Sequence, residues 1–161
     1  MLFRSKTANP ISVPETGGNV TFTFLIENIG TEAVTLTSLL DNQFGNLNGQ
    51  GNVVLPVAIP VGGSVSFTVV KWLASDTMTA HTNVVTAKAE DNEKNEVTDT
   101  DDATVTFTNV APAIQVTKTA NPTAVPETGG NVTFTFLIEN TGTESVTLTK
   151  IGRASCRERV Y

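Results

Sequence analysis

The sequence predicts an all-β protein, and three observations support this prediction. Apolar and polar residues alternate in short runs, which is the pattern of a strand with one buried face. Clusters of Gly, Pro, Asn and Asp separate these runs at regular intervals, as turns do. A long segment also recurs almost unchanged, because Lys6–Thr37 and Lys118–Thr149 are identical at 28 of 32 positions. Together they favour a small β-domain repeated in tandem.

The clearest predicted strand is Val20–Glu27. Every second residue from Val20 to Ile26 is apolar and most of the others are polar, so one face should be buried. Threonine, whose branched Cβ favours extended backbone, fills many of the polar positions. Similar alternation predicts strands at Val34–Ser38, Val65–Val69, Val85–Ala89 and Val105–Phe107, and shorter strands are expected at Ile11–Val13 and Val53–Leu55.

Turn residues punctuate these strands. The predicted turns are Glu15–Asn19, Asn28–Thr31, Asp41–Gly51, Pro60–Ser64, Asp91–Glu96 and Asp101-Asp102. A helical pattern longer than a turn or two is considered only at Trp72–Met78. About seven short strands in about a hundred residues are typical of an immunoglobulin-like antiparallel β-sandwich, with a closed barrel as the alternative. The Cys–Trp–Cys spacing of antibody domains is absent, so only the architecture is predicted.

The repeat divides the chain into two unequal parts. Residues 6–111 are predicted to form one complete repeat, and residues 112–149 a linker with the first three strands of a truncated second copy. The offset of 112 residues is long enough for each complete unit to bury its own core. In the truncated copy the apolar row from Val132 to Ile138 lacks a facing sheet, so we expect that part to be unstable by itself.

The two ends of the chain differ from the sequence between them. All four arginines, the single Cys156 and the single Tyr161 lie in residues 1–5 and 150–161. Leu2–Ser5 can be encoded by CTC TTC CGA TCT, whose reverse complement occurs within a coding of Lys150–Ala154. We therefore predict that both ends derive from translated sequencing adapter, with a native basic tail as the alternative.

Without these ends the chain is strongly acidic. Of the 16 acidic residues only Glu158 lies in the excluded ends, and five of the 10 basic residues remain, so the net charge is 5 − 15 = −10. Nucleic acids and anionic membrane surfaces are therefore not expected partners, whereas divalent cations fit. No apolar run is long enough for a membrane span, so no membrane insertion is expected.

Four segments, in order, resemble a known repeat family. They read KTANPISVPETGGNVTFTFLIENIGTEAVTLTSL, DNQFGNLNGQG, LPVAIPVGGSVSFTV and NEVTDTDDATVTFTNV. They resemble the family called domain of unknown function eleven, found in large prokaryotic surface proteins, and the resemblance covers residues 6–149. It implies tandem immunoglobulin-like sandwiches that act as stalks, spacers or adhesion modules. Many relatives carry Cys where Val53 and Phe67 stand here, so core packing is expected to replace that disulfide.

An acidic segment is the candidate metal site. Seven carboxylates lie within the thirteen residues Glu90–Asp102, and calcium takes about six to eight oxygen ligands at flexible geometry. The candidate ligands are Asp91, Glu93, Asp99, Asp101 and Asp102. The segment begins like an EF-hand loop but lacks the glycine at the sixth position. Two interpretations stay open, a calcium site or a solvated acidic hairpin, and no other cofactor is indicated.

The loop Asp41–Gly51 is the candidate binding loop. Its candidate contact residues are Asp41, Asn42, Asn46 and Asn48, which would meet a glycan or a protein at one end of the sandwich. The alternative is a long turn whose Asn and Gly residues only satisfy its backbone. Two interpretations of Trp72 stay open, an exposed aromatic that touches a glycan or a partner, or a rim residue packed on the sandwich.

No catalytic machinery is indicated, so we predict that the protein is not an enzyme. His81 is the only histidine and is expected at the surface, and no serine has a plausible base. A lysine–asparagine isopeptide bond, known in some surface domains, would need Lys6 beside Asn109. The first and last strands of such a sandwich commonly run parallel, which places these two residues far apart, so this bond is not expected.

The sequence therefore predicts a structural repeat, a stalk or spacer of an extracellular or cell-surface protein that calcium could stiffen. Its expected partners are neighbouring repeats of the same chain and an unidentified surface ligand. The alternative is an adhesion module that recognises a glycan or protein through its end loops. An enzyme elsewhere in a longer parent chain is also compatible with the sequence.

Overall fold

The computed structural model describes residues 3–150. All regular secondary structure in that range is β-strand. The chain divides into two compact units, Met1–Asn109 and Val110–Tyr161. The all-β prediction is confirmed. The predicted adapter-derived residues 1–2 and 151–161 lie outside the described part, whereas residues 3–5 belong to the first strand.

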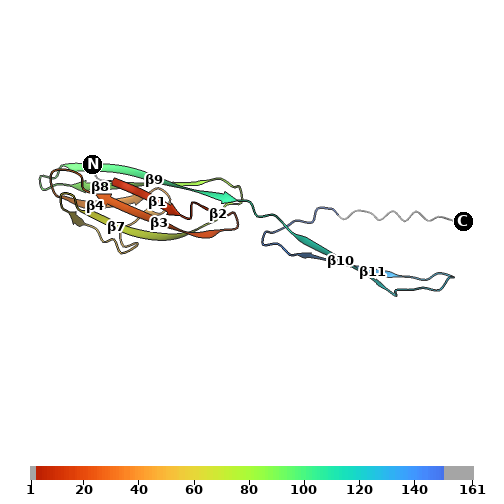
Figure 1. Ribbon diagram of the computed structural model, residues 1–161. Helices are drawn as coiled ribbons and strands as arrows, with labels where there is room; N and C mark the ends of the chain where they lie inside the picture. The colour runs from red at the N-terminus through yellow and green to blue at the C-terminus, as the bar shows by residue number, and fades with distance from the viewer. Residues whose placement is uncertain (1–2, 151–161) are drawn as a thin grey trace. The chain divides into compact units, whose positions relative to one another are not determined.

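The first unit is a sandwich of two sheets (Figure 1). One sheet has three antiparallel strands in the order β1 (Phe3–Asn9), β3 (Gly18–Glu27) and β7 (Ser64–Leu73). The other has the order β2 (Ser12–Pro14), β9 (Glu96–Thr108), β8 (His81–Glu90), β4 (Val34–Asp41) and β5 (Gly45–Asn46), and β6 (Val57–Ile59) also pairs with β4. These sheets confirm the predicted β-sandwich.

The N-terminal segment contributes to both sheets. β1 pairs antiparallel with β3, and after a short break β2 pairs parallel with β9 in the facing sheet. The parallel pairing places Val13 opposite Phe107. The chain therefore crosses from one sheet to the other within its first strands, and this crossing ties the two layers together at their edge.

The core lies between the two sheets. From β3, the four predicted apolar residues Val20, Phe22, Phe24 and Ile26 are fully buried. Leu36, Leu39, Val85 and Val105 face them from β4, β8 and β9 and are also fully buried. The rings of Phe24 and Phe67 stack at 4.7 Å between centroids. Burial at every second residue of β3 confirms the predicted strand and its inward face.

One predicted strand of the first unit is wrong. Val53–Leu55 is not a strand. Pairing with β4 begins only at β6, directly after Pro56, which has no N–H to donate. Val53 is nevertheless buried in the core, in a loop held by hydrogen bonds from Gly49 N to Val53 O and from Val53 N to Gln50 O. Val53 and Phe67 both belong to the core.

Three further differences concern turns and the first strand. The predicted turn Asp101-Asp102 instead lies inside β9. A strand can hold both charged residues because adjacent side chains face opposite sides, one outward and one toward a hydrogen-bond donor. The predicted helical turn at Trp72–Met78 is absent, since β7 continues to Leu73. Phe3–Asn9 forms β1, although its sequence predicts no strand.

The second unit contains a hairpin of β10 (Ile114–Asn121) and β11 (Thr133–Asn140). Lys118 lies opposite Phe136, as Lys6 lies opposite Phe24, so the register of the first unit recurs 112 residues later. The predicted third strand is absent from the described residues of this unit. In the first unit the matching segment, β4, pairs with β8, and the described part of the second unit offers no counterpart to β8.

The two near-identical segments offer a matched pair of substitutions, one at a buried position and one at an exposed position. Phe24 is fully buried, whereas Phe136, at the same place in the repeat, is 57% exposed. Phe24→Ala should lower the free energy of unfolding of the first unit by about 3–5 kcal/mol, because it opens a cavity between the sheets. Phe136→Ala should leave that transition unchanged. Urea unfolding followed by the fluorescence of Trp72 measures both, and equal effects would contradict this account of the core.

Candidate functional site

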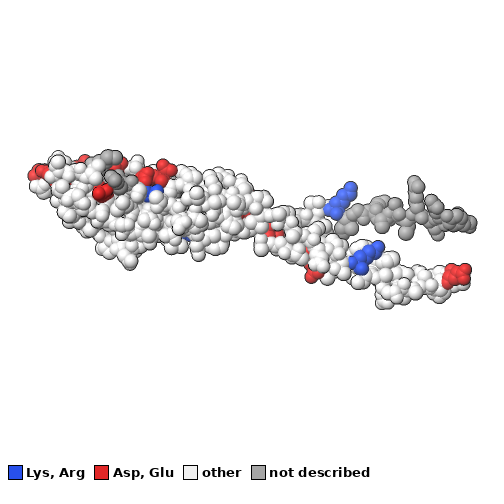
Figure 2. Space-filling view, in the orientation of Figure 1, with Lys and Arg blue, Asp and Glu red and all other residues white. Residues whose placement is uncertain are grey.

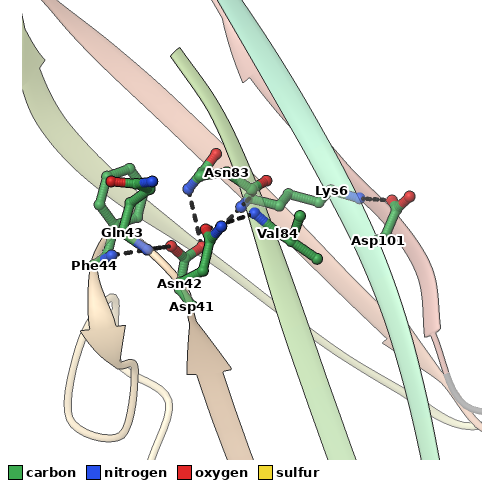
Figure 3. A network of polar contacts seen from close by, with 8 residues as sticks. All are labelled: Lys6, Asp41, Asn42, Gln43, Phe44, Asn83, Val84 and Asp101. Carbon is green, nitrogen blue, oxygen red and sulfur yellow. Dashed lines mark hydrogen bonds and ion pairs between the residues drawn. The ribbon is translucent and has the colours of Figure 1, made fainter.

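A cluster of three buried polar side chains lies between the sheets of the first unit (Figure 3). Lys6 Nζ, from β1, is 2.7 Å from Asp41 Oδ2 at the end of β4 and donates a hydrogen bond to the main-chain oxygen of Asn83 at 2.9 Å. Asn83 Nδ2, from β8, donates to the same Asp41 Oδ2 at 2.9 Å. One carboxylate oxygen therefore contacts both an amine and an amide nitrogen.

The surroundings of this cluster are apolar. Nζ of Lys6 lies 5.5–5.8 Å from the ring centroids of Phe22, Phe24 and Phe44. The side chains of Lys6 and Asp41 have no exposed surface, and Asn83 is fully buried. Asn83 Oδ1 is also buried and accepts no hydrogen bond from the described residues. An acceptor without a donor is rare in a protein interior, which makes this amide unusual.

Burial and pairing shift the ionisation of both charged partners. Burial lowers the pKa of Lys6, because desolvation disfavours the ammonium, and the neighbouring Asp41 only partly offsets that effect. For Asp41, burial alone would raise the pKa. Hydrogen bonds from Lys6 and from the backbone N–H groups of Phe44 and Gln43 outweigh it, so the pKa of Asp41 lies below its usual value.

The predicted binding loop uses its polar side chains internally. Asp41 Oδ1 accepts the N–H groups of Gln43 and Phe44, both at 2.9 Å, so this residue points into the molecule. Asn42 Oδ1 accepts the N–H of Val84 at 2.8 Å. Asn46 Oδ1 accepts the N–H of Asn48, and Asn48 Oδ1 that of Leu55. The four candidate residues therefore shape the loop, and Asn42, Asn46 and Asn48 also remain exposed.

One glycine of this loop permits its close approach to the opposite sheet. Gly51 has φ of 56°, in the left-handed region that side chains disfavour. A Cβ at this position would lie 2.0 Å from the main-chain oxygen of Thr68 on β7. Only glycine therefore fits this contact between the loop and β7.

The acidic segment is divided between a turn and a strand. Carboxylate oxygens of Asp91 and Glu93, in the β8–β9 turn, lie within 4.8 Å of one another and of Glu32, from the β3–β4 connection. Hydrogen bonds from Asn95 lower the pKa of Asp91, at 2.8 Å to Oδ1 and 2.9 Å to Oδ2. A shallow pocket of about 210 Å³ adjoins Asp91. Sequence reasoning missed Glu32, because it lies on another loop.

The other three candidate ligands lie along β9. Asp99 and Asp101 stand opposite Ala87 and Val85 and share one face, whereas Asp102 stands opposite Val84 on the other face. Asp101 Oδ2 accepts the main-chain N–H of Lys6 at 2.6 Å and so holds β1 against β9. The structure brings Asp91 and Glu93 together with Glu32 and leaves Asp99, Asp101 and Asp102 outside that group. Figure 2 shows that carboxylates outnumber lysines on the visible face of the first unit.

Two aromatic residues differ in their packing. Trp72 is 64% exposed, yet its indole covers Gly17, where a Cβ would lie 2.4 Å from the ring. His81, predicted at the surface, is instead half-buried, with its ring stacked on Phe44 at 5.7 Å. The reason is its position at the start of β8, directly before the core-facing part of that strand.

Comparison of the chain with protein-family models gives no match, and comparison with curated proteins also gives none. Among residues 3–150 no helix is long and apolar enough to cross a membrane.

The half-buried imidazole predicts a specific pH dependence. Burial lowers the pKa of His81, and the Lys6 ammonium adds to this effect while Asp41 opposes it. As pH falls through about 6.5, the unfolded chain therefore takes up a proton before the folded one does. Stability should fall as pH drops through this value and level off below the folded pKa. Between about pH 7 and pH 5, the free energy of unfolding measured with urea should fall less for His81→Phe than for wild type. Equal falls would contradict the assignment.

The acidic group predicts a response to calcium. With calcium at about a hundred times its dissociation constant, the melting temperature should be roughly 10 °C higher than with chelator. Glu32→Gln should abolish this difference, because Glu32 brings the third carboxylate to the group. Asp102→Asn, on the outward face of β9, should preserve it. Coincident wild-type melting curves would leave the group as a solvated turn only.

Proposed function

We propose that this chain is a non-catalytic structural repeat, a stalk or spacer of a secreted or cell-surface protein. The near-identity of Lys6–Thr37 and Lys118–Thr149 is the observation that carries the proposal. A repeat that serves as a spacer needs a stable fold and a regular period, and it needs no individual site that differs between copies. The recurrence of the β1–β3 register in β10–β11 supports a second copy of the same domain.

The distribution of polar groups supports the same proposal. Three buried polar side chains, those of Lys6, Asp41 and Asn83, contact one another across the sandwich. The acidic side chains of the β8–β9 turn are exposed or half-buried and disfavour edge-to-edge association of neighbouring units. The resemblance to tandem repeats of prokaryotic surface proteins adds an extracellular location and partnership with adjacent repeats.

An adhesion module is the second candidate function. The observation in its favour is that the loop Asp41–Gly51 keeps the amides of Asn46 and Asn48 exposed on a backbone fixed by internal hydrogen bonds. A rigid loop that offers polar groups to solvent can bind a glycan or protein at a low entropic cost. In this case the loop would vary between full repeats while the strands stayed constant.

The spacer proposal is tested by the length of longer arrays. Residues 6–117 span one period of the repeat, and chains with two, three and four such periods ahead of residues 118–161 can be compared. Small-angle X-ray scattering should show a maximum dimension that grows by a constant increment per period. A dimension that levels off would show that the units fold back on one another and would overturn the proposal.

A further inference from the structure

The buried cluster holds the three groups that an internal amide-forming reaction needs. Lys6 supplies an amine, Asn83 supplies an acyl group that can release ammonia, and Asp41 supplies a carboxyl group in contact with both. We propose that the first unit forms an isopeptide bond between Lys6 Nζ and Asn83 Cγ, with Asp41 as the proton carrier.

The hydrogen bonds place the reactants in an order that suits this step. Asp41 Oδ2 lies 2.7 Å from Lys6 Nζ and 2.9 Å from Asn83 Nδ2, so the same oxygen touches the nitrogen that attacks and the nitrogen that leaves. Nζ also contacts the main-chain oxygen of Asn83 at 2.9 Å, which keeps it beside that residue. Holding reactants at such distances replaces an encounter in solution and accelerates the reaction by many orders of magnitude.

The step balances without any further reactant. Asp41 Oδ2 accepts one proton from the Lys6 ammonium, and the freed lone pair of Nζ attacks Cγ of Asn83. Asp41 then gives this proton to Nδ2, the Cγ–Nδ2 bond breaks, and ammonia leaves. Oδ2 takes up a second proton from Nζ, so the products are a neutral amide, ammonia and a protonated Asp41. This is general acid–base catalysis by a single carboxyl group.

The surroundings favour the neutral form of the attacking Lys6 amine. The three phenylalanine rings around Nζ and the complete burial of the cluster exclude water, so the ammonium is poorly solvated and gives up its proton more readily. Asn83 Oδ1 accepts no hydrogen bond from the described residues, which leaves this oxygen available to the protonated carboxyl group as charge develops on it. Water exclusion also protects the carbonyl group from hydrolysis.

The bond would join the two layers of the sandwich. Lys6 belongs to the sheet of β1, β3 and β7, whereas Asn83 belongs to the sheet that contains β8. The resulting covalent link between layers does not depend on the proposed spacer function. Within a spacer it would keep β1 attached when the chain is pulled.

Lys118 is a built-in control for this reaction. Its Nζ lies 4.4 Å and 5.3 Å from the ring centroids of Phe134 and Phe136, the counterparts of Phe22 and Phe24. Within the described residues it has no carboxylate partner and no asparagine amide placed against it. Lys118 should therefore remain a free amine that trypsin recognises.

Mass spectrometry of the full chain tests the proposal. The denatured protein should weigh one ammonia less than its sequence requires. Digestion with trypsin and a glutamate-specific protease should yield residues 5–15 joined to residues 72–88, with Lys6 uncut and Lys118 cut. The full sequence mass in the folded wild-type chain would overturn the proposal. Loss of ammonia without joined peptides, as from cyclisation of Asn48 before Gly49, would overturn it as well.

Variants separate the roles of the three residues. Asn83→Ala and Asp41→Ala should both restore the full sequence mass, the first by removing the acyl group and the second by removing the proton carrier. Asn109→Ala, which alters the asparagine considered from sequence alone, should still lose one ammonia. Joined peptides in Asp41→Ala would overturn the role of Asp41. Because loss of a buried partner can prevent folding, the wild-type masses decide whether the bond forms.

Discussion

The enclosure of the Lys6 ammonium between two sheets is the constraint on which the rest of the first unit depends. An unpaired charge in an apolar interior is strongly unfavourable, so the fold must supply its partners. Both partners, Asp41 and Asn83, come from the sheet opposite Lys6. The cluster is therefore complete only when the two sheets have packed, which makes it a test of correct pairing between them.

The same lysine also fixes the register of β1. Its side chain contacts Asp41 while its main-chain N–H donates to Asp101 on β9. A shift of β1 by one residue would turn Lys6 outward and would break both interactions. β1 is thus held by β3 through backbone pairing and by the opposite sheet through two carboxylates, although it forms no ladder with that sheet.

The strands were predictable from sequence where a local pattern marks them, and the buried cluster was not. Val20–Ile26 alternates within one strand, so its buried face can be inferred without knowing its neighbours. Lys6, Asp41 and Asn83 come from three strands, separated by 35 and 42 residues, and no local pattern shows that a lysine points inward. The sequence pattern places Asp41 in an outward-facing loop, and it suggests Asn109 as the reaction partner of Lys6. The acidic group shows the same limit, since Glu32 comes from a separate loop.

The two copies of the repeat separate what local sequence specifies from what tertiary contacts add. β10 and β11 pair in the register of β1 and β3, so the near-identical sequence alone is enough to select the hairpin. Phe136 nevertheless stays exposed where Phe24 is buried, because the burial of Phe24 requires β4, β8 and β9 as a second layer. The enclosure of the lysine has the same requirement, since Asp41 ends β4 and Asn83 lies on β8. Pairing of these strands is thus local, whereas the core and the polar cluster require both sheets of the first unit.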